Sequence, residues 1–192
     1  MKKILVINGH PNNVSLCSSL AQQYAKGATE SGFEVRLVQL SDLQFDPVLH
    51  KGYLKIQDLE PDLVQAQKDL LWAEHLVIVH PIWWGSVPAL LKGFLDRVLL
   101  PGFAFKYHKD SPWWDRLLKG RTGRLIVTTD APSWWNKFVL RDPVIRMMKN
   151  SVLEFCGIKP VKVTQLDRIK DRPKDVIESY LKKVYELGKR GA

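Results

Sequence analysis

Residues 75–100 read HLVIVHPIWWGSVPALLKGFLDRVLL and combine three kinds of segment in a fixed order. Residues 75–80 form a short apolar run, which is typical of a strand buried on both faces. The loop that follows ends at Pro88, and proline favours the first turn of a helix, here predicted over 89–100. A buried strand, a loop and a helix form the unit from which parallel sheets are built.

The same unit recurs along the rest of the chain. Apolar or alternating segments predict four further strands, at 3–8, 34–40, 124–129 and 161–166. Helices are expected from Ser15 to a stop at Gly32, over 62–73, over 142–155 with a stop at Gly157, and around 176–187. Residues 41–60 and 101–121 contain proline and glycine without periodicity and are expected to be irregular. Five strands alternating with helices predict an α/β fold of three layers, with a five-stranded parallel sheet in the order 2-1-3-4-5.

The size and composition of the chain suit one domain. It has 192 residues, 45% of them hydrophobic, and a chain of this size folds without disulfides or a structural metal. Its two cysteines, Cys17 and Cys156, are far apart, and no metal-ligand spacing surrounds them. The first residues predict a strand rather than a signal peptide, and no apolar stretch approaches the roughly 20 residues that span a bilayer. We therefore expect a single domain over residues 1–192, located in the cytoplasm.

The formal net charge of +9 does not by itself indicate a nucleic-acid partner. Lysines and arginines are scattered, with a mild excess from Lys159 onward, and no zinc knuckle, arginine-rich arm or other reader motif accompanies them. We expect a solvated basic surface and no nucleic acid. Such a surface still attracts anionic dinucleotides or an anionic partner.

The strand order 2-1-3-4-5 places ligands beyond the carboxyl ends of the strands, at the loops after strands one, three and four. The first loop, HPNNVS (10–15), leads into a helix, whose unpaired N–H groups suit a phosphate. Ser15, Ser18 and Ser19 add hydroxyl groups, although a serine at a helix start is also a common cap. The loop has neither a Walker A nor a G-x-G-x-x-G pattern, which argues against ATPases and classical dehydrogenases.

The second and third loops carry paired tryptophans. In the second loop, PIWWGSVP (81–88), Trp83 and Trp84 either flank a flat heteroaromatic ring or pack in the core or a subunit interface. The third loop, TTDAPSWW (128–135), begins with small residues whose backbone can approach the edge of a ligand. All three loops are expected to meet at one crevice.

Residues 81–100 are similar to the pattern P-x-x-W-x-x-x-P-A-x-L-K-G-x-x-D-R of the NAD(P)H:quinone reductases with a flavodoxin-like fold. This family includes the ancillary flavoproteins of bacterial potassium-efflux systems. The stretches GFAFKY (102–107) and LIVTT (125–129) follow in the same order, and the resemblance runs from Lys3 to about Pro160. It implies a flavodoxin-like α/β/α sandwich, a bound FMN or FAD, hydride from NADH or NADPH, a quinone-like small-molecule acceptor and a homodimer.

The resemblance also implies roles for individual residues. It places the flavin phosphate and ribityl chain near His10, Ser15, Leu16, Cys17 and Ser18, and the flavin ring near Pro81, Ile82, Trp83, Trp84 and Gly85. It places the polar edge of the ring near Thr128, Thr129, Asp130 and Ala131. Phe105 and Tyr107 would close the substrate pocket from the partner subunit. From its residue type, Tyr107 is expected either to hydrogen-bond an oxygen of the acceptor or to pack in the interface. Apart from the resemblance, four tryptophans in the loops beyond the sheet are expected to form either an apolar lid for aromatic acceptors or a dimer contact: Trp113, Trp114, Trp134 and Trp135.

The chain departs from its relatives at three places. Cys17 stands where relatives often have asparagine, and a small buried residue is expected there rather than a reactive thiol. Asp130 and Ala131 replace a pair of glycines, and an anionic Asp130 disfavours a reduced flavin anion unless its carboxylate points away. The tyrosine–histidine pair of the mammalian enzymes has no counterpart.

Three alternatives remain open from the sequence. A regulatory subunit of a potassium-efflux transporter would use the flavin site as a redox sensor and associate peripherally with the inner face of the membrane. A one-electron carrier shares the fold, but such carriers are typically acidic. A nitro- or azo-reductase differs in its acceptor alone. FMN is preferred over FAD because no segment beyond the three loops provides an obvious adenine site.

Overall fold

The computed structural model describes residues 1–55 and 57–192, and its centre is a five-stranded parallel sheet. The strand order is β2-β1-β3-β6-β7, which is the predicted order 2-1-3-4-5 when the strands of this sheet are counted alone. Each neighbouring pair is parallel. The strands are β1 (Lys3–Asn8), β2 (Glu34–Gln39), β3 (His75–Pro81), β6 (Thr122–Thr128) and β7 (Val161–Leu166).

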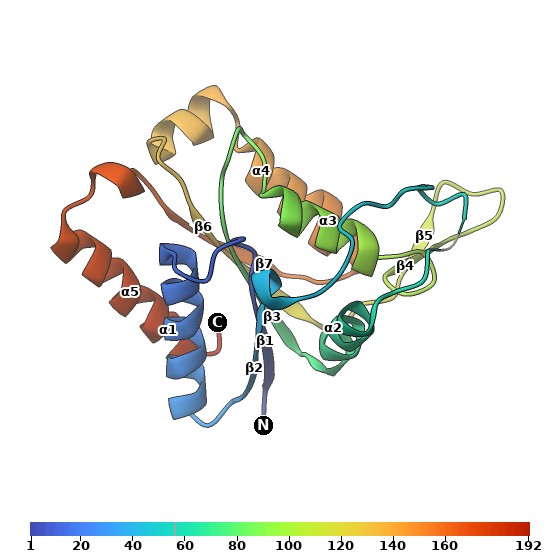
Figure 1. Ribbon diagram of the computed structural model, residues 1–192, viewed down its shortest axis with the longest axis horizontal. Helices are drawn as coiled ribbons and strands as arrows, with labels where there is room; N and C mark the ends of the chain where they lie inside the picture. Colours follow the sequence, from blue (N-terminus) through green and yellow to red (C-terminus); the bar gives the residue numbers. More distant parts are fainter. Residues whose placement is uncertain (56) are drawn as a thin grey trace.

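Helices cover both faces of the sheet (Figure 1). Helices α1 (Leu16–Glu30) and α5 (Lys174–Lys189) pack together on one face, and α2 (Pro61–Trp72), α3 (Ala89–Val98) and α4 (Pro143–Arg146) lie on the other. Successive side chains of strand β1 face opposite sides of the sheet and so belong to different cores. Ile4 and Val6 belong to the core under α1 and α5, whereas Leu5 and Ile7 belong to the core under α2 and α3. No helix in the described ranges is long and apolar enough to cross a membrane.

The segments predicted to be irregular contain short regular elements. Residues 101–121 include an antiparallel hairpin, β4 (Phe105–Tyr107) with β5 (Trp114–Arg116), and residues 40–42 form the 3-10 turn η1 (Leu40–Asp42). Three residues are too few to show a period in the sequence. The helix predicted over 142–155 is α4 followed by the π-helical η3 (Met147–Glu154). Another π-helical turn, η2 (Trp135–Val139), lies where the sequence predicted an open loop, and η4 (Ile169–Asp171) follows β7.

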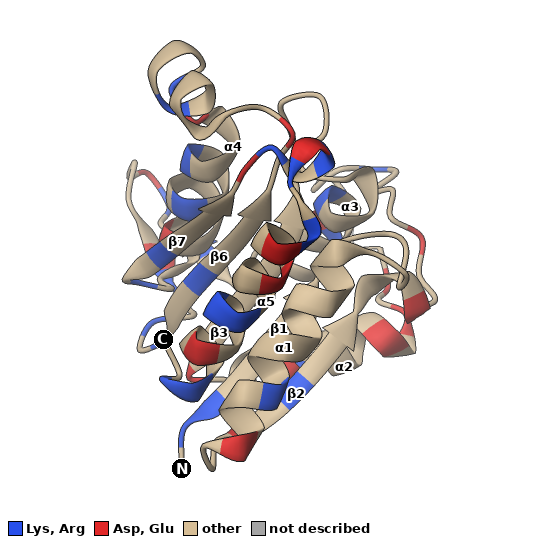
Figure 2. Cartoon of the chain, turned by 90° about the vertical axis from the view of Figure 1, so that its left-hand side faces the viewer, with Lys and Arg blue, Asp and Glu red and all other residues tan. Residues whose placement is uncertain are grey.

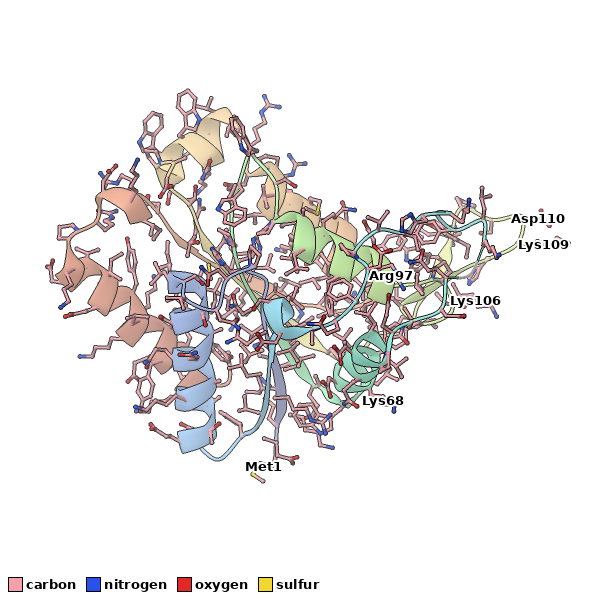
Figure 3. The ribbon with its side chains drawn as sticks, viewed as in Figure 1. Met1, Lys68, Arg97, Lys106, Lys109 and Asp110 are labelled. Atoms are coloured by element: carbon pink, nitrogen blue, oxygen red, sulfur yellow. The ribbon has the colours of Figure 1, made fainter. Side chains whose placement is uncertain are left out.

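Helix α3 anchors described residues of the segment between η1 and α2. Gly93 faces Pro47, and a Cβ at this position would lie 2.5 Å from the carbonyl oxygen of Pro47. One turn later, the fully buried Arg97 donates to the carbonyl oxygen of Asp58 (2.7 Å) and to Glu60 Oε2 (2.9 Å) (Figure 3). The glycine and arginine of the 81–100 pattern therefore have structural roles.

Candidate functional site

A cavity of about 180 Å³ lies where the carboxyl ends of β1, β3 and β6 meet. The three loops that the sequence predicted to converge all contribute to its wall, as does Ile169 of η4, which the sequence analysis missed. Ile169 follows the fifth strand of the sheet, and no local pattern singles it out. The lining residues are His10, Leu16, Cys17, Pro81, Ile82, Trp83, Thr128, Thr129, Asp130 and Ile169.

The amino end of α1 opens onto this cavity. Ser15 is the cap residue, and its side chain accepts a hydrogen bond from Ser18 N (3.2 Å). The N–H groups of Leu16 and Cys17 have no hydrogen-bond partner in the described part of the chain, as expected for the first turn of a helix. Ser15 and Ser18 themselves lie outside the cavity wall, and Ser18 is buried against Gln39. An anion at this point would meet backbone groups rather than serine hydroxyls.

His10 is held with one edge of its ring toward the cavity. Its Nδ1 lies 3.0 Å from Asn12 N and 3.1 Å from Asn12 O, so this nitrogen is occupied and the Nε2 edge remains for a ligand. The ring packs edge-on against Trp83, with 5.2 Å between centroids. Burial lowers the pKa of His10, which keeps the imidazole neutral at pH 7 in the absence of a bound anion.

Cys17 is a buried, unreactive thiol. Its Sγ lies 3.3 Å from Thr128 Oγ1, which joins α1 to the end of β6 at the floor of the cavity. Burial raises the pKa of Cys17 to about 11, so the thiol is protonated at neutral pH. The interpretation of Cys17 as a small buried residue is confirmed.

The second loop folds as a tight turn that displays a tryptophan. Trp83 and Ser86 exchange two backbone hydrogen bonds of 2.9 Å, and both residues between them have positive φ, +50° at Trp84 and +67° at Gly85. These angles fit a type I′ turn, which favours glycine or asparagine at both positions. The side chain of Trp84 is fully exposed and takes no part in the cavity wall.

The third loop uses most of its backbone N–H groups internally. Thr129 N donates to Leu166 O (3.0 Å), and Ala131 N donates to Thr129 Oγ1 (3.2 Å). Among Thr129, Asp130 and Ala131, the N–H of Asp130 is therefore the one left for a ligand within the described residues. The carboxylate of Asp130 accepts from Lys170 N (3.1 Å), which holds it toward η4. Asn136 is buried behind this loop, and its Nδ2 lies 3.4 Å from Thr129 Oγ1.

Phe105 and Tyr107 line a different cavity in this chain. It measures about 380 Å³, shares no residue with the first cavity, and is walled by α3, η3 and the β4–β5 hairpin. Tyr107 is 61% exposed, and Phe105 packs edge-on against Phe155. Trp134 and Trp135 line neither cavity. The structure therefore brings nine of the predicted site residues together in this wall. The predicted residues that lie outside the wall within one chain are Ser15, Ser18, Trp84, Gly85, Phe105, Tyr107, Ala131, Trp134 and Trp135.

Comparisons with known proteins agree with this fold. The model of a family described as having a flavodoxin-like fold matches residues 2–188. A protein of Haemophilus influenzae named as an NAD(P)H oxidoreductase is 30% identical over 163 residues, covering 82% of this chain and 80% of its own. The ribosyldihydronicotinamide dehydrogenase [quinone] of Mus musculus is 28% identical over 188 residues, covering 82% and 78%.

Solved structures are similar to this chain in fold. Smu.1420 from Streptococcus mutans has a TM-score of 0.84 at 30% identity, with 98% of this chain and 99% of that chain covered. An FMN-dependent NADH-azoreductase from Bacillus anthracis, solved in complex with FMN, has a TM-score of 0.74 at 22% identity, with 99% of each chain covered. The matched family model, the strand order and the cavity at the carboxyl ends of the strands lead to one conclusion: this chain belongs to the flavodoxin-like fold family.

Proposed function

We propose that this protein, as one domain over residues 1–192, is a flavin-dependent NAD(P)H:quinone oxidoreductase. The observation that carries the proposal is the 180 Å³ cavity, where a helix amino end, an apolar wall and a polar backbone edge meet at the carboxyl ends of three strands. These are the groups that a phosphate, a flat ring and the polar edge of that ring require. The quinone and NAD(P)H specificities named for the relatives point the same way.

The donor set fits FMN. The free N–H groups of Leu16 and Cys17, with the Nε2 edge of His10, offer donors for one phosphate group. Ile82 and Trp83 offer an apolar wall for a ring. FMN is favoured over FAD because this amino end of α1 is the one phosphate-binding feature of the cavity. The FMN of the Bacillus anthracis azoreductase supports the same choice.

A bound flavin supplies the centre that takes hydride from NADH or NADPH and passes it to a quinone-like acceptor. The chain's own contribution is position and electrostatics. The N–H of Asp130 would donate to the polar edge of a bound ring and stabilise negative charge there, while its carboxylate accepts from Lys170 N in η4. Ile82 and Trp83 exclude water from one face of the site. No side chain of the cavity is needed as a nucleophile.

We also propose a homodimer in which the partner completes the site. Tyr107 is 61% exposed and Trp113 is 70% exposed, on a hairpin that projects from the α3 side and borders the larger apolar cavity. Exposed aromatic area of this kind marks an interface. Light scattering at micromolar concentration should give twice the 22.1 kDa of one chain, and the mass of one chain would contradict the dimer.

The alternative is a regulatory subunit of a potassium-efflux transporter, in which the flavin site senses redox state and the chain attaches peripherally to the inner face of a membrane. The basic surface, with a net charge of +9, favours an anionic partner and gives this alternative its support. A pull-down from a detergent-solubilised membrane fraction, with the transporter identified by mass spectrometry, tests it.

The deciding experiment is an anaerobic spectrophotometric titration. The protein is loaded with FMN, reduced with NADH or NADPH, and then mixed with a benzoquinone. We expect rapid bleaching of the flavin band, recovery on addition of the quinone, and parallel double-reciprocal lines in steady state, since donor and acceptor occupy the site in turn. Absence of reduction by both nicotinamides would favour the regulatory subunit. Absence of FMN and FAD binding would overturn the functional proposal.

A further inference from the structure

A turn that projects beyond the sheet carries an unusual concentration of exposed apolar side chains. This projecting turn consists of residues 133–141 and contains η2. Trp134 is 59% exposed, Phe138 72% and Val139 49%, and Trp135 and Leu140 are also exposed. Single exposed apolar residues are common on proteins, but a contiguous group of this size marks an interaction surface.

Hydrogen bonds connect the projecting turn to the third loop and close its end. Its one buried residue, Asn136, reaches back to Thr129 Oγ1 (3.4 Å). At its end Asp142 N donates to Asn136 O (2.7 Å), and both Arg141 and Asp142 adopt positive φ, +60° and +47°. Left-handed backbone is unfavourable for both residue types, so the surrounding contacts determine this conformation. The fold therefore presents these aromatic side chains at the surface.

The projecting turn lies next to the turn that follows β3. Leu140 and Asn136 share a small hollow with Ile82 and Gly85, so residues of the two turns are in the same neighbourhood. The fully exposed Trp84 extends the apolar surface on that side. Both turns lie at the end of the sheet where the carboxyl ends of the strands are found (Figure 1).

The charged residues of the projecting turn and of the helix beyond it are almost all basic. Residues 131–150 contain Lys137, Arg141, Arg146 and Lys149 but a single acidic residue, Asp142. Lys137, Arg141 and Arg146 are exposed, and no ion pair joins them to any other described residue. The ammonium group of Lys137 lies 5.5 Å from the ring of Phe138, beside the apolar surface. Figure 2 shows basic residues on this projecting part and on the helix below it.

We propose that the projecting turn binds the surface of a bilayer that contains anionic phospholipids. Tryptophan and phenylalanine flanked by lysine and arginine are the residues that insert at the boundary between headgroups and acyl chains. A second copy of this chain fits this surface less well, because both copies would bring Lys137, Arg141 and Arg146 to the contact without an acidic partner in the turn to pair with them. This lipid contact goes beyond the proposed reaction, and its measurement needs neither flavin nor acceptor.

Vesicle sedimentation tests the proposal directly. The purified protein is mixed at low salt with vesicles of equal parts phosphatidylglycerol and phosphatidylcholine, or with phosphatidylcholine alone. We expect sedimentation with the anionic vesicles, little with the neutral ones, and loss of binding at high salt. Brominated acyl chains in the anionic vesicles should quench part of the tryptophan emission.

Two double variants separate the apolar and the electrostatic contributions. Trp134→Ser with Phe138→Ser should weaken vesicle binding about tenfold or more. Lys137→Gln with Arg141→Gln should weaken it roughly 30-fold, since each cation near an anionic surface contributes about a fivefold factor. The matched controls are Leu71→Ser on α2 and Lys182→Gln with Lys183→Gln on α5. They change exposed residues elsewhere on the protein, and both should bind vesicles as the parent does.

Three results would overturn the proposal. The first is failure of the parent protein to sediment with anionic vesicles at low salt. The second is vesicle binding by both double variants at the parent's level. The third is a fall in molar mass by light scattering for the Trp134→Ser and Phe138→Ser variant, which would assign the surface to a second copy of the chain. FMN titration of the same proteins without vesicles reports separately on the proposed reaction.

Discussion

Replacing Trp84 with asparagine should raise the stability of the flavin-free protein while it weakens flavin binding. Trp84 occupies a left-handed position, with φ of +50°, and its side chain is fully exposed. Left-handed backbone costs a residue with a side chain about 1–2 kcal/mol, and asparagine tolerates it better than tryptophan does. Because the exposed ring contributes no packing in the free protein, we expect a gain of about 1 kcal/mol in the free energy of unfolding.

Flavin binding should change in the opposite direction. Trp84 lies outside the cavity wall of the free chain, but the family resemblance places it beside the flavin ring. Loss of that contact, about 0.5–1.5 kcal/mol, should weaken FMN binding roughly two- to thirteenfold. Urea denaturation of the flavin-free protein measures the first effect, and quenching of FMN fluorescence on titration measures the second.

Trp134→Asn is the matched control. It makes the same chemical change at another tryptophan, which is 59% exposed and has a φ of −64°, and it should leave stability within about 0.5 kcal/mol of the parent. Destabilisation by Trp84→Asn would show that the ring packs against the free protein and would refute the strain argument. An unchanged FMN affinity would refute the role of Trp84 as a ring wall.

Three further perturbations test the fold. Gly27→Ala should lower the free energy of unfolding by about 1–3 kcal/mol, measured by urea denaturation, because the added Cβ overlaps the carbonyl of Tyr185 where α1 meets α5. Arg97→Leu should lower the free energy of unfolding by about 3 kcal/mol, because it removes the hydrogen-bond donor of the Asp58 carbonyl and the ion-pair partner of Glu60. It should also speed proteolysis within 46–60. Unchanged proteolysis would contradict the role of Arg97 as an anchor of this segment. Burial lowers the pKa of His80 to about 4, so stability should be full above pH 6.5 and fall by about 3 kcal/mol as the pH drops toward 4. His80→Asn should make this fall shallower in denaturation curves recorded between pH 7 and 4.5.

The sequence predicted the central sheet well because its three inner strands, β1, β3 and β6, are buried on both faces. Runs such as residues 3–8 and 75–80 have no polar interruption, and helices separate them at regular intervals. The predicted ends of the strands were less accurate. Strand β6 begins at Thr122, two residues before the predicted start, because Gly123 packs against Ile158 and Val161 and so pairs despite its poor strand propensity.

The sequence could not predict the elements that depend on local hydrogen-bond geometry. The π-helical η2 and η3 differ from α-helices in which carbonyl each N–H meets, and side-chain type does not record this difference. The left-handed conformation of Trp84 was equally hidden, since a bulky aromatic residue is a poor candidate for positive φ. The orientation of the Asp130 carboxylate depends on Lys170 N, forty residues away in the chain.

The pattern in residues 81–100 combines residues of two kinds, and the structure separates them. Gly93 and Arg97 hold the segment before α2 and take no part in the 180 Å³ cavity, whereas Pro81, Ile82 and Trp83 form its wall. A match at Gly93 and Arg97 therefore supports the fold, and a match at Pro81–Trp83 supports the kind of ligand that the cavity binds. Because both kinds agree here with the free N–H groups at the start of α1, the flavin proposal depends on the site as well as on the fold.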